Sequence, residues 1–280
     1  MKTIIRVALV AGVALAALTP AIASHSWSTY HWASNGGGVP LTVKTAITSQ
    51  WTSSIGQAIL DWDTSNFLSL TAAPANGVNT RKCNPIAGQI LICNDSYGQR
   101  GWLGIASVWT TNGHISQATT KLNDTYFNSA QYNKPEWRAL VACQEIGHDF
   151  GLNHQDEAFG NANLGTCMDY TNQPLGGGVY GNLQNIAPNQ HDYDQLQTIY
   201  NHGDPGVAAA TNFAVRQVGR PVPQSGDSSL GAGDGPAEWG RAIHRDGKGR
   251  PDLFQKDLAP GRKVFTHVFW AIGEGPGASQ

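Results

Sequence analysis

The sequence predicts an α/β protein of the α+β kind, built on one sheet with helices packed against it. Strand-like alternation recurs at 40–47, 102–109 and 115–122, and a period of two is typical of a strand. Apolar stripes with helical spacing occupy 51–62 and 135–150. Hydrophobic residues make up 40% of the 280 residues, which is enough for a packed core and excludes wholesale disorder.

The N-terminal residues predict export. Lys2 and Arg6 precede an unbroken run of 12 apolar and small residues at 7–18, and residues 21–23 (Ala-Ile-Ala) fit a small-x-small cleavage site. The run is shorter than the roughly 20 apolar residues that a membrane span needs, and no later stretch could span a bilayer. Residues 1–23 are therefore predicted to be the signal peptide of a secreted, extracellular protein rather than a membrane anchor.

Four cysteines follow the predicted signal peptide. An exported chain meets an oxidising compartment, so disulfides are expected, and four cysteines allow three pairings. Among these, the favoured pairing joins Cys83 to Cys93, which closes a short loop, and Cys143 to Cys167. We favour this pairing over zinc binding by the thiols, because the sequence has no C-x-x-C pair.

The first half of the predicted domain reads as strand, helix and further strands. A strand at 40–47 is followed by an amphipathic helix at 51–62. The stretch 66–96 mixes short apolar runs with Asn, Pro and Gly, and it predicts a strand and an elaborated loop. Strands at 102–109 and 115–122 follow.

The second half of the sequence predicts two helices, followed by a change in composition. Pro135 suits the first turn of a helix, and Gly151 is a plausible stop for it. Pro188 opens a last helix. The Gly- and Pro-rich residues 204–238 predict a linker, and the patterned residues 239–280 predict a small β-type C-terminal module.

The charge balance excludes one class of partner. The formal net charge is −2, from 18 basic and 20 acidic residues, so nucleic acid is not expected as the main partner, because phosphate binding needs clustered Lys and Arg. Seven basic residues lie at 241–263, but three aspartates interrupt them. This stretch is interpreted as the solvated face of a β-hairpin.

The residues 143–154 contain the side chains that predict a catalytic site. Gln144 and His148 are four apart, so on a helix they share one face. Glu145 lies beside them, and Gly151 permits a sharp turn that would bring His154 back to the same point. Three ligands and one carboxylate then converge, which predicts a catalytic zinc site with an open position for water and a base for its proton.

This segment resembles the metzincin zinc-protease signature H-E-x-x-H-x-x-G-x-x-H, with Gln144 in place of the first histidine. The residues 165–170, Gly-Thr-Cys-Met-Asp-Tyr, are similar to the family's methionine turn, which places Met168 beneath the zinc and Tyr170 near it. The resemblance covers roughly 40–201. It implies a matrixin-like metallopeptidase domain at 24–203.

The resemblance also implies the architecture and the mechanism. A twisted mixed sheet would carry an antiparallel edge strand, with a zinc helix and a closing C-terminal helix. Zn²⁺ would be held by Gln144, His148 and His154, Glu145 would take the proton of the attacking water, and Tyr170 would stabilise the oxyanion. An extended peptide would pair with the edge strand. The expected substrate-binding residues are Gly101, Trp102, Leu103, Gly104, Ile105 and Ala106.

The expected function is therefore a secreted zinc-dependent metalloendopeptidase that acts on peptides or proteins as a monomer. Gln144 keeps an alternative open, since an amide oxygen is a weaker zinc donor than imidazole. The chain would then be a weak or inactive homologue that binds peptides, or Gln144 would bind no metal and His191 would be the spare ligand. In a third interpretation, the C-terminal module docks on a cell surface or glycan and the metal serves structure.

Other candidate residues carry weaker signals. Asp156 and Glu157 could join a calcium site, although an acidic loop that faces water is the favoured interpretation. His31, His114 and His202 show no spacing that predicts a role.

Overall fold

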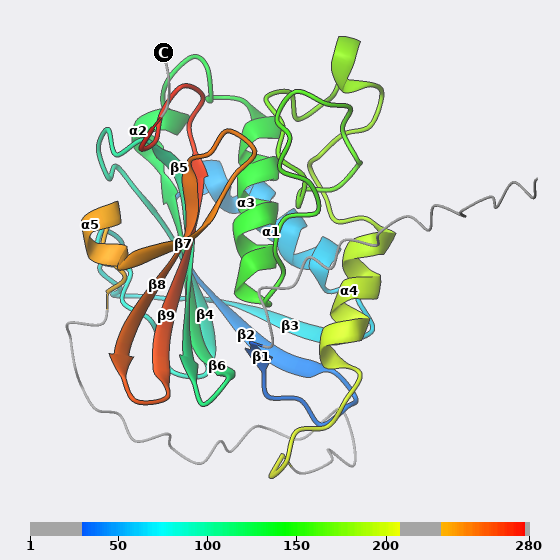
Figure 1. Cartoon of the computed structure of the whole chain (residues 1–280), viewed down its shortest axis with the longest axis vertical. Helices are drawn as coiled ribbons and strands as arrows, with labels where there is room; N and C mark the ends of the chain where they lie inside the picture. The colour runs from blue at the N-terminus through cyan, green and yellow to red at the C-terminus, as the bar shows by residue number, and fades with distance from the viewer. Residues whose placement is uncertain (1–29, 208–230, 278–280) are drawn as a thin grey trace, which may run out of the picture.

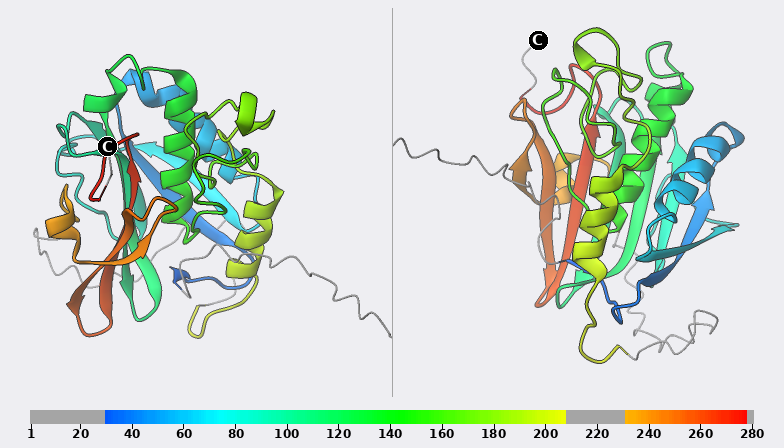
Figure 2. Two further views of the ribbon diagram at one scale, coloured as in Figure 1. Left: turned by 45° about the horizontal axis from the view of Figure 1, so that its top comes forward. Right: turned by 90° about the vertical axis from the view of Figure 1, so that its right-hand side faces the viewer.

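The computed structural model describes residues 30–207 and 231–277, so the predicted signal peptide and most of the predicted linker lie outside the described residues. A single mixed sheet of nine strands runs in the order β3-β2-β4-β6-β5-β9-β8-β7, and β1 pairs with β6 beside this path. The helices α1, α3 and α4 lie on one side of the sheet, and the short helix α5 lies on the other (Figures 1 and 2).

The N-terminal half of the sheet is parallel. Strand β2 pairs in parallel with both β3 and β4, and β4 pairs in parallel with β6. The stretch at 66–96 therefore holds two strands rather than the one expected. The bounds of these elements are His31–Trp32 for β1, Val39–Ala46 for β2, Ser49–Trp62 for α1, Leu68–Pro74 for β3 and Gln89–Asp95 for β4.

The middle of the chain supplies an antiparallel hairpin and the longest helix. Strands β5 and β6 pair antiparallel, and α3 packs against both. Helix α4 begins two residues after Pro188, because the Asn189 side chain accepts hydrogen bonds from the first backbone N–H groups and forms a capping box. The bounds are Trp102–Thr111 for β5, His114–Asn123 for β6, Asp124–Phe127 for α2, Pro135–Asp149 for α3, Gly178–Tyr180 for the 3₁₀ turn η1 and Gln190–Tyr200 for α4.

The C-terminal residues continue the main sheet instead of forming a separate small module. Strand β9 pairs antiparallel with β5 from Trp102↔Trp270 to Thr111↔Arg262. The basic stretch contributes a strand of its own, β8, between β7 and β9. The bounds are Pro236–Trp239 for α5, Arg241–Arg245 for β7, Pro251–Ala259 for β8 and Arg262–Trp270 for β9.

Burial on both faces explains the position of β9. Phe265 and Phe269 belong to the main core between the sheet and the helices. Val268 and Trp270 join a second cluster on the α5 side, together with Trp239. A strand that is buried on both faces is more stable inside a sheet than at its edge. The alternation of the sequence indicates a strand here but does not reveal its neighbour.

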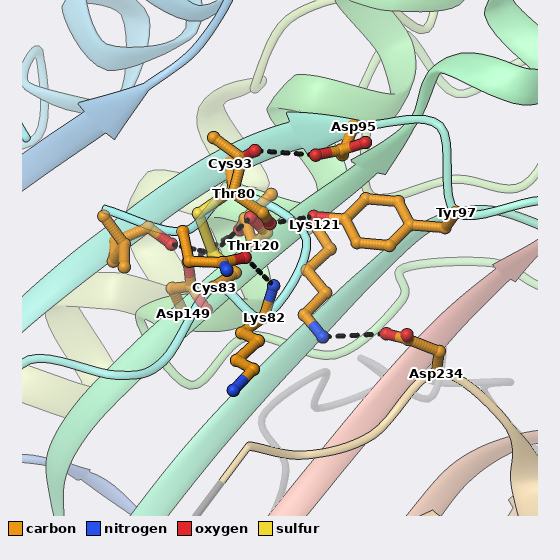
Figure 3. Close-up of a disulfide and its surroundings, with 12 residues drawn as sticks. Thr80, Lys82, Cys83, Cys93, Asp95, Tyr97, Thr120, Lys121, Asp149 and Asp234 are labelled. Atoms are coloured by element: carbon orange, nitrogen blue, oxygen red, sulfur yellow. Dashed lines mark hydrogen bonds and ion pairs between the residues drawn. A yellow bond between two sulfur atoms is a disulfide. The ribbon is translucent and has the colours of Figure 1, made fainter. Parts of the chain in front are cut away.

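Two disulfides brace the sheet and the long helix. Cys83 is bonded to Cys93 and Cys143 to Cys167, which are the pairs that the sequence favours. Figure 3 shows the first disulfide beside β6, where Lys121 also forms an ion pair with Asp234 at 2.8 Å. The second links α3 to the segment that carries Met168. In the part of the chain that the structure describes, no helix has the length and apolar character of a membrane span.

Candidate metal centre

The turn after α3 brings two histidines together. Gly151 has φ 90°, and a Cβ there would lie 2.7 Å from the Tyr30 carbonyl oxygen, so only glycine fits without strain. The chain reverses at this point, and His154 returns to the end of the helix. The Nε2 atoms of His148 and His154 lie 3.1 Å apart, as the spacing in the sequence predicts.

The other ring nitrogens of these histidines define the tautomers. His148 Nδ1 is 2.8 Å from the Leu152 carbonyl oxygen, which can only accept a hydrogen bond. His154 Nδ1 faces carboxylate oxygens of Glu157 at 3.4 Å and Asp252 at 3.7 Å. Each Nδ1 therefore carries the proton in the neutral ring. Each Nε2 then presents a lone pair to the other, which is unfavourable unless a cation lies between them.

The spacing of these atoms fits zinc. Zn–N bonds of about 2.0–2.1 Å at tetrahedral angles put two ligand atoms about 3.3–3.4 Å apart, close to the observed 3.1 Å. The carboxylates behind His154 are the kind of outer hydrogen-bond partner that orients zinc-bound imidazoles. The donor set and its geometry therefore fit a zinc ion.

A third histidine reaches this point from the far end of the chain. The ligand nitrogens of His148, His154 and His267 all lie within 4.8 Å of one another. The His267 ring, on β9, stacks on His148 with centroids 3.9 Å apart. Burial and the nearby histidines lower the pKa of His267 well below its usual value, so the ring is neutral. The sequence does not predict a role for His267, because no motif spacing links it to residues 144–154.

Gln144 lies with its amide fixed. Its Nε2 donates to the Cys167 carbonyl oxygen at 2.7 Å, which leaves Oε1 as the only atom that could ligate a cation. This oxygen is buried and has no hydrogen-bond partner among the described residues. His191, the spare ligand considered from the sequence, belongs to none of the metal-compatible groups in the described ranges.

Glu145 is fully buried between α3 and the sheet. A Cβ at Gly104 would lie 2.9 Å from its Oε1, so the strand can pass this close only because residue 104 is glycine. Burial raises the pKa of Glu145 well above its usual value and the Asp149 carboxylate adds to the shift, while backbone groups of Ala106 and Phe269 lower it. The carboxyl therefore faces β5 and β9 rather than solvent.

Tyr170 lies against His154, and Met168 packs against α3 at the residue before His148. A Cβ at Gly147 would lie 2.6 Å from the Met168 sulfur, so this methionine packs directly against α3. The Tyr170 ring centroid is 4.0 Å from that of His154, and its hydroxyl lies 3.5 Å from the Asp252 carboxylate.

The acidic loop residues have separate contacts. Glu157 faces His154 and, at 3.6 Å, His244. Asp156 instead accepts a hydrogen bond from the Asn161 side chain at 2.9 Å within its own loop. The two carboxylates thus point to different partners.

The expected substrate-binding edge is occupied. Strand β5 is hydrogen-bonded to β6 on one side and to β9 on the other. The residues at 101–106 therefore have no free edge for a peptide in this structure, contrary to the expectation from the sequence. The side chains of the centre are covered accordingly, with exposed fractions of 1% for His148, 6% for His154 and 0% for His267.

Comparison with known proteins gives only distant likenesses. No protein-family model and no curated protein matches the sequence. Among solved structures, high choriolytic enzyme 1, a hatching enzyme zinc-protease from the medaka Oryzias latipes, is 12% identical, with a TM-score of 0.33 over 63% of this chain and 97% of the other. Myroilysin is also 12% identical, with a TM-score of 0.33 over 61% of this chain and 82% of the other.

Proposed function

We propose that this chain is a zinc-dependent peptidase of the metzincin type, with Glu145 as the general base. The facing Nε2 atoms of His148 and His154, 3.1 Å apart with both Nδ1 atoms committed elsewhere, are the observation that carries the proposal. Glu145 belongs to the same helix and precedes His148 by less than one turn. Tyr170 packs against His154 and Met168 packs against Gly147, the neighbour of His148, and both contacts support the assignment.

Each residue has a distinct part in the proposed reaction. Bound zinc would supply Lewis acidity, which polarises a scissile carbonyl and lowers the pKa of water. Glu145 accepts the proton of the attacking water and delivers it to the leaving amine. Burial raises the pKa of Glu145, so its carboxylate is a stronger base than that of an exposed glutamate, which favours the first of these steps. Glu157 and Asp252 orient His154.

The β5–β9 pairing adds a condition to this proposal. A peptide can pair with β5 at 101–106 only after β9 has left, since β9 occupies that edge. The same movement withdraws His267 from His148 and His154, because His267 is part of β9. We therefore propose that the intact chain is a closed form of the peptidase, and that release of β9 makes the centre accessible.

The test is a cleavage assay on the full chain with a site-specific protease recognition sequence introduced within 208–230. Zinc-loaded protein is assayed on casein before and after cutting. Three forms are compared, namely the wild type, Glu145→Gln and the control Glu136→Gln, which changes the same residue type in the first turn of α3.

The wild type and Glu136→Gln should cleave casein faster after the cut, and Glu145→Gln should stay at background. If zinc-loaded wild type remains indistinguishable from Glu145→Gln in both states, the chain is not a peptidase. A peptide-binding role would then account for the same centre.

We further propose that the protein is secreted. Its two disulfides are typical of oxidising compartments. Sequencing the N-terminus of exported protein should find cleavage after residue 23. Recovery of the disulfide-free chain from the cytoplasm would contradict the proposal.

A further inference from the structure

A second cluster of ligand-type side chains lies apart from the first, and it joins three segments that are distant in sequence. His31 comes from β1, His114 opens β6, and His202 and Asp204 follow the end of α4 (Figure 1). The parallel pairing of β1 with β6 sets His31 directly beside His114. The Asp204 backbone N–H donates to the Ser34 carbonyl oxygen at 2.8 Å, which fixes the third segment against β1.

The ligand atoms of this cluster are spaced like those around one ion. His31 Nε2 is 3.2 Å from His202 Nε2 and 3.2 Å from Asp204 Oδ2. His202 Nε2 is 3.4 Å from Asp204 Oδ1, and His114 Nδ1 is 3.9 Å from Asp204 Oδ2. Tetrahedral zinc with bonds of about 2.0–2.1 Å needs separations of about 3.3–3.4 Å. The ligand atoms of His31, His114 and Asp204 all lie within 4.8 Å of one another, and His202 Nε2 lies beside two of these residues.

Hydrogen bonds alone leave this arrangement incomplete. His31 Nε2 can carry one proton, yet it faces both Asp204 oxygens and the Nε2 of His202. His114 Nδ1 is a buried atom without a hydrogen bond to any residue in the described ranges, and it points at Asp204 from beyond hydrogen-bond distance. A cation among His31, His114 and Asp204 would take a lone pair from each of them, and His202 Nε2 lies close enough to His31 and Asp204 to be the fourth ligand.

The chemistry of the donors selects the ion. Three imidazole nitrogens and one carboxylate oxygen suit zinc, whereas calcium and magnesium prefer all-oxygen shells. Four protein ligands complete a tetrahedral shell, which is the mark of a structural site rather than a catalytic one. The side chains of His31 and Asp204 are 11% and 7% exposed, and those of His114 and His202 are 37% and 47% exposed. The ion therefore has a path from solvent.

We propose that His31, His114, His202 and Asp204 bind a second, structural zinc ion. This ion ties β1 and the segment after α4 to the start of β6. The site shares no residue with the proposed peptidase centre, so it stands whether or not the chain cleaves peptides.

Zinc content of the full-length chain tests the proposal. Protein is loaded with zinc chloride, dialysed and analysed by inductively coupled plasma mass spectrometry. Four forms are compared: the wild type, a first-centre variant (His148→Ala with His154→Ala), a second-site variant (His114→Ala with His202→Ala) and the control His191→Ala, a histidine at the start of α4 outside both groups. We expect two zinc ions in the wild type and the control, and one in each double variant.

A spectroscopic measurement keeps the proposal falsifiable if the second-site variant folds poorly. Cobalt bound to the first-centre variant should give the intense visible absorption of a tetrahedral ion. The single change His202→Ala in that background, on a half-exposed side chain, should weaken cobalt binding by at least tenfold. Zinc should also raise the Tm of the first-centre variant. A first-centre variant that binds neither zinc nor cobalt after dialysis overturns the proposal, as does one whose binding His202→Ala leaves unchanged.

Discussion

The disulfide between Cys143 and Cys167 gives the sharpest test of how the candidate centre is built. It joins α3 to the residue before Met168, and the Cys167 carbonyl oxygen also accepts the Gln144 amide hydrogen bond. Replacing both cysteines by alanine should therefore act on two properties at once. It should lower the free energy of unfolding, because the unfolded chain gains conformational entropy when the cross-link is lost. It should also loosen the segment that packs Met168 against Gly147.

The size of the stability effect follows from the loop that the bond closes. A sequence separation of 24 corresponds to about 3.5 kcal/mol at 25 °C in the chain-entropy relation. The matched control is the other disulfide, between Cys83 and Cys93, whose separation of 10 corresponds to about 2.7 kcal/mol. That bond belongs to a separate small cluster that includes Leu91, so it should leave zinc affinity unchanged.

The assay is guanidinium unfolding followed by tryptophan fluorescence, together with a zinc-competition titration. The Cys143/Cys167 variant should lose more stability than the control variant and should also bind zinc at least tenfold more weakly. Equal zinc affinity in both variants would refute the reasoning, because the bond would then have no role in shaping the centre. A larger stability loss in the control would refute the loop-length argument.

Three further predictions concern single residues. His267→Ala should weaken zinc binding to the first centre at least tenfold, measured by competition with a chelating dye; an unchanged affinity would exclude His267 as a ligand. Gly147→Ala should destabilise the protein by about 1–2 kcal/mol in chemical denaturation, because the added methyl group would overlap the Met168 sulfur. The control Gly56→Ala in α1, which has open space around the added carbon, should instead stabilise the protein by about 0.5–1 kcal/mol. Burial raises the pKa of Asp192 from 3.8 to about 6, so the folded form holds this proton more tightly than the unfolded chain does. The free energy of unfolding should therefore fall as pH rises from about 4 to 6. Asp192→Asn should flatten that fall in thermal melts, and an identical slope would contradict the assignment.

Much of the fold could be predicted because its signals are local. The stripe of Trp51, Ile55, Ile59 and Trp62 repeats at the helical period, and all four side chains are buried in α1. Strands β5 and β6 were predicted for a similar reason, from alternation within a few residues. The boundary of α4 differed by two residues, since the Asn189 side chain, not Pro188, caps that helix.

The features that the sequence does not predict are those that depend on which strands pair with each other. Strand β8 lies in a stretch whose charges suggest a solvated surface, yet Leu253 and Phe254 are buried there. The neighbour of β5 could not be read from alternation, because a period of two is the same at an edge and in the middle of a sheet. The place of β9 inside the sheet depends on the two core clusters that cover its faces, and the alternation of its residues does not reveal them.

The sequence by itself determined the local geometry of the segment from α3 to His154. The four-residue spacing of Gln144 and His148, and the conformational freedom of Gly151, act within one turn of chain, so their geometry follows from local rules. Tertiary structure alone decided that His267 and Asp252 join this centre, that β9 occupies the edge of β5, and that His31 meets Asp204 across 173 residues. These contacts arise where separate strands bury their side chains together, and no local pattern in the sequence encodes which strand lies next to which.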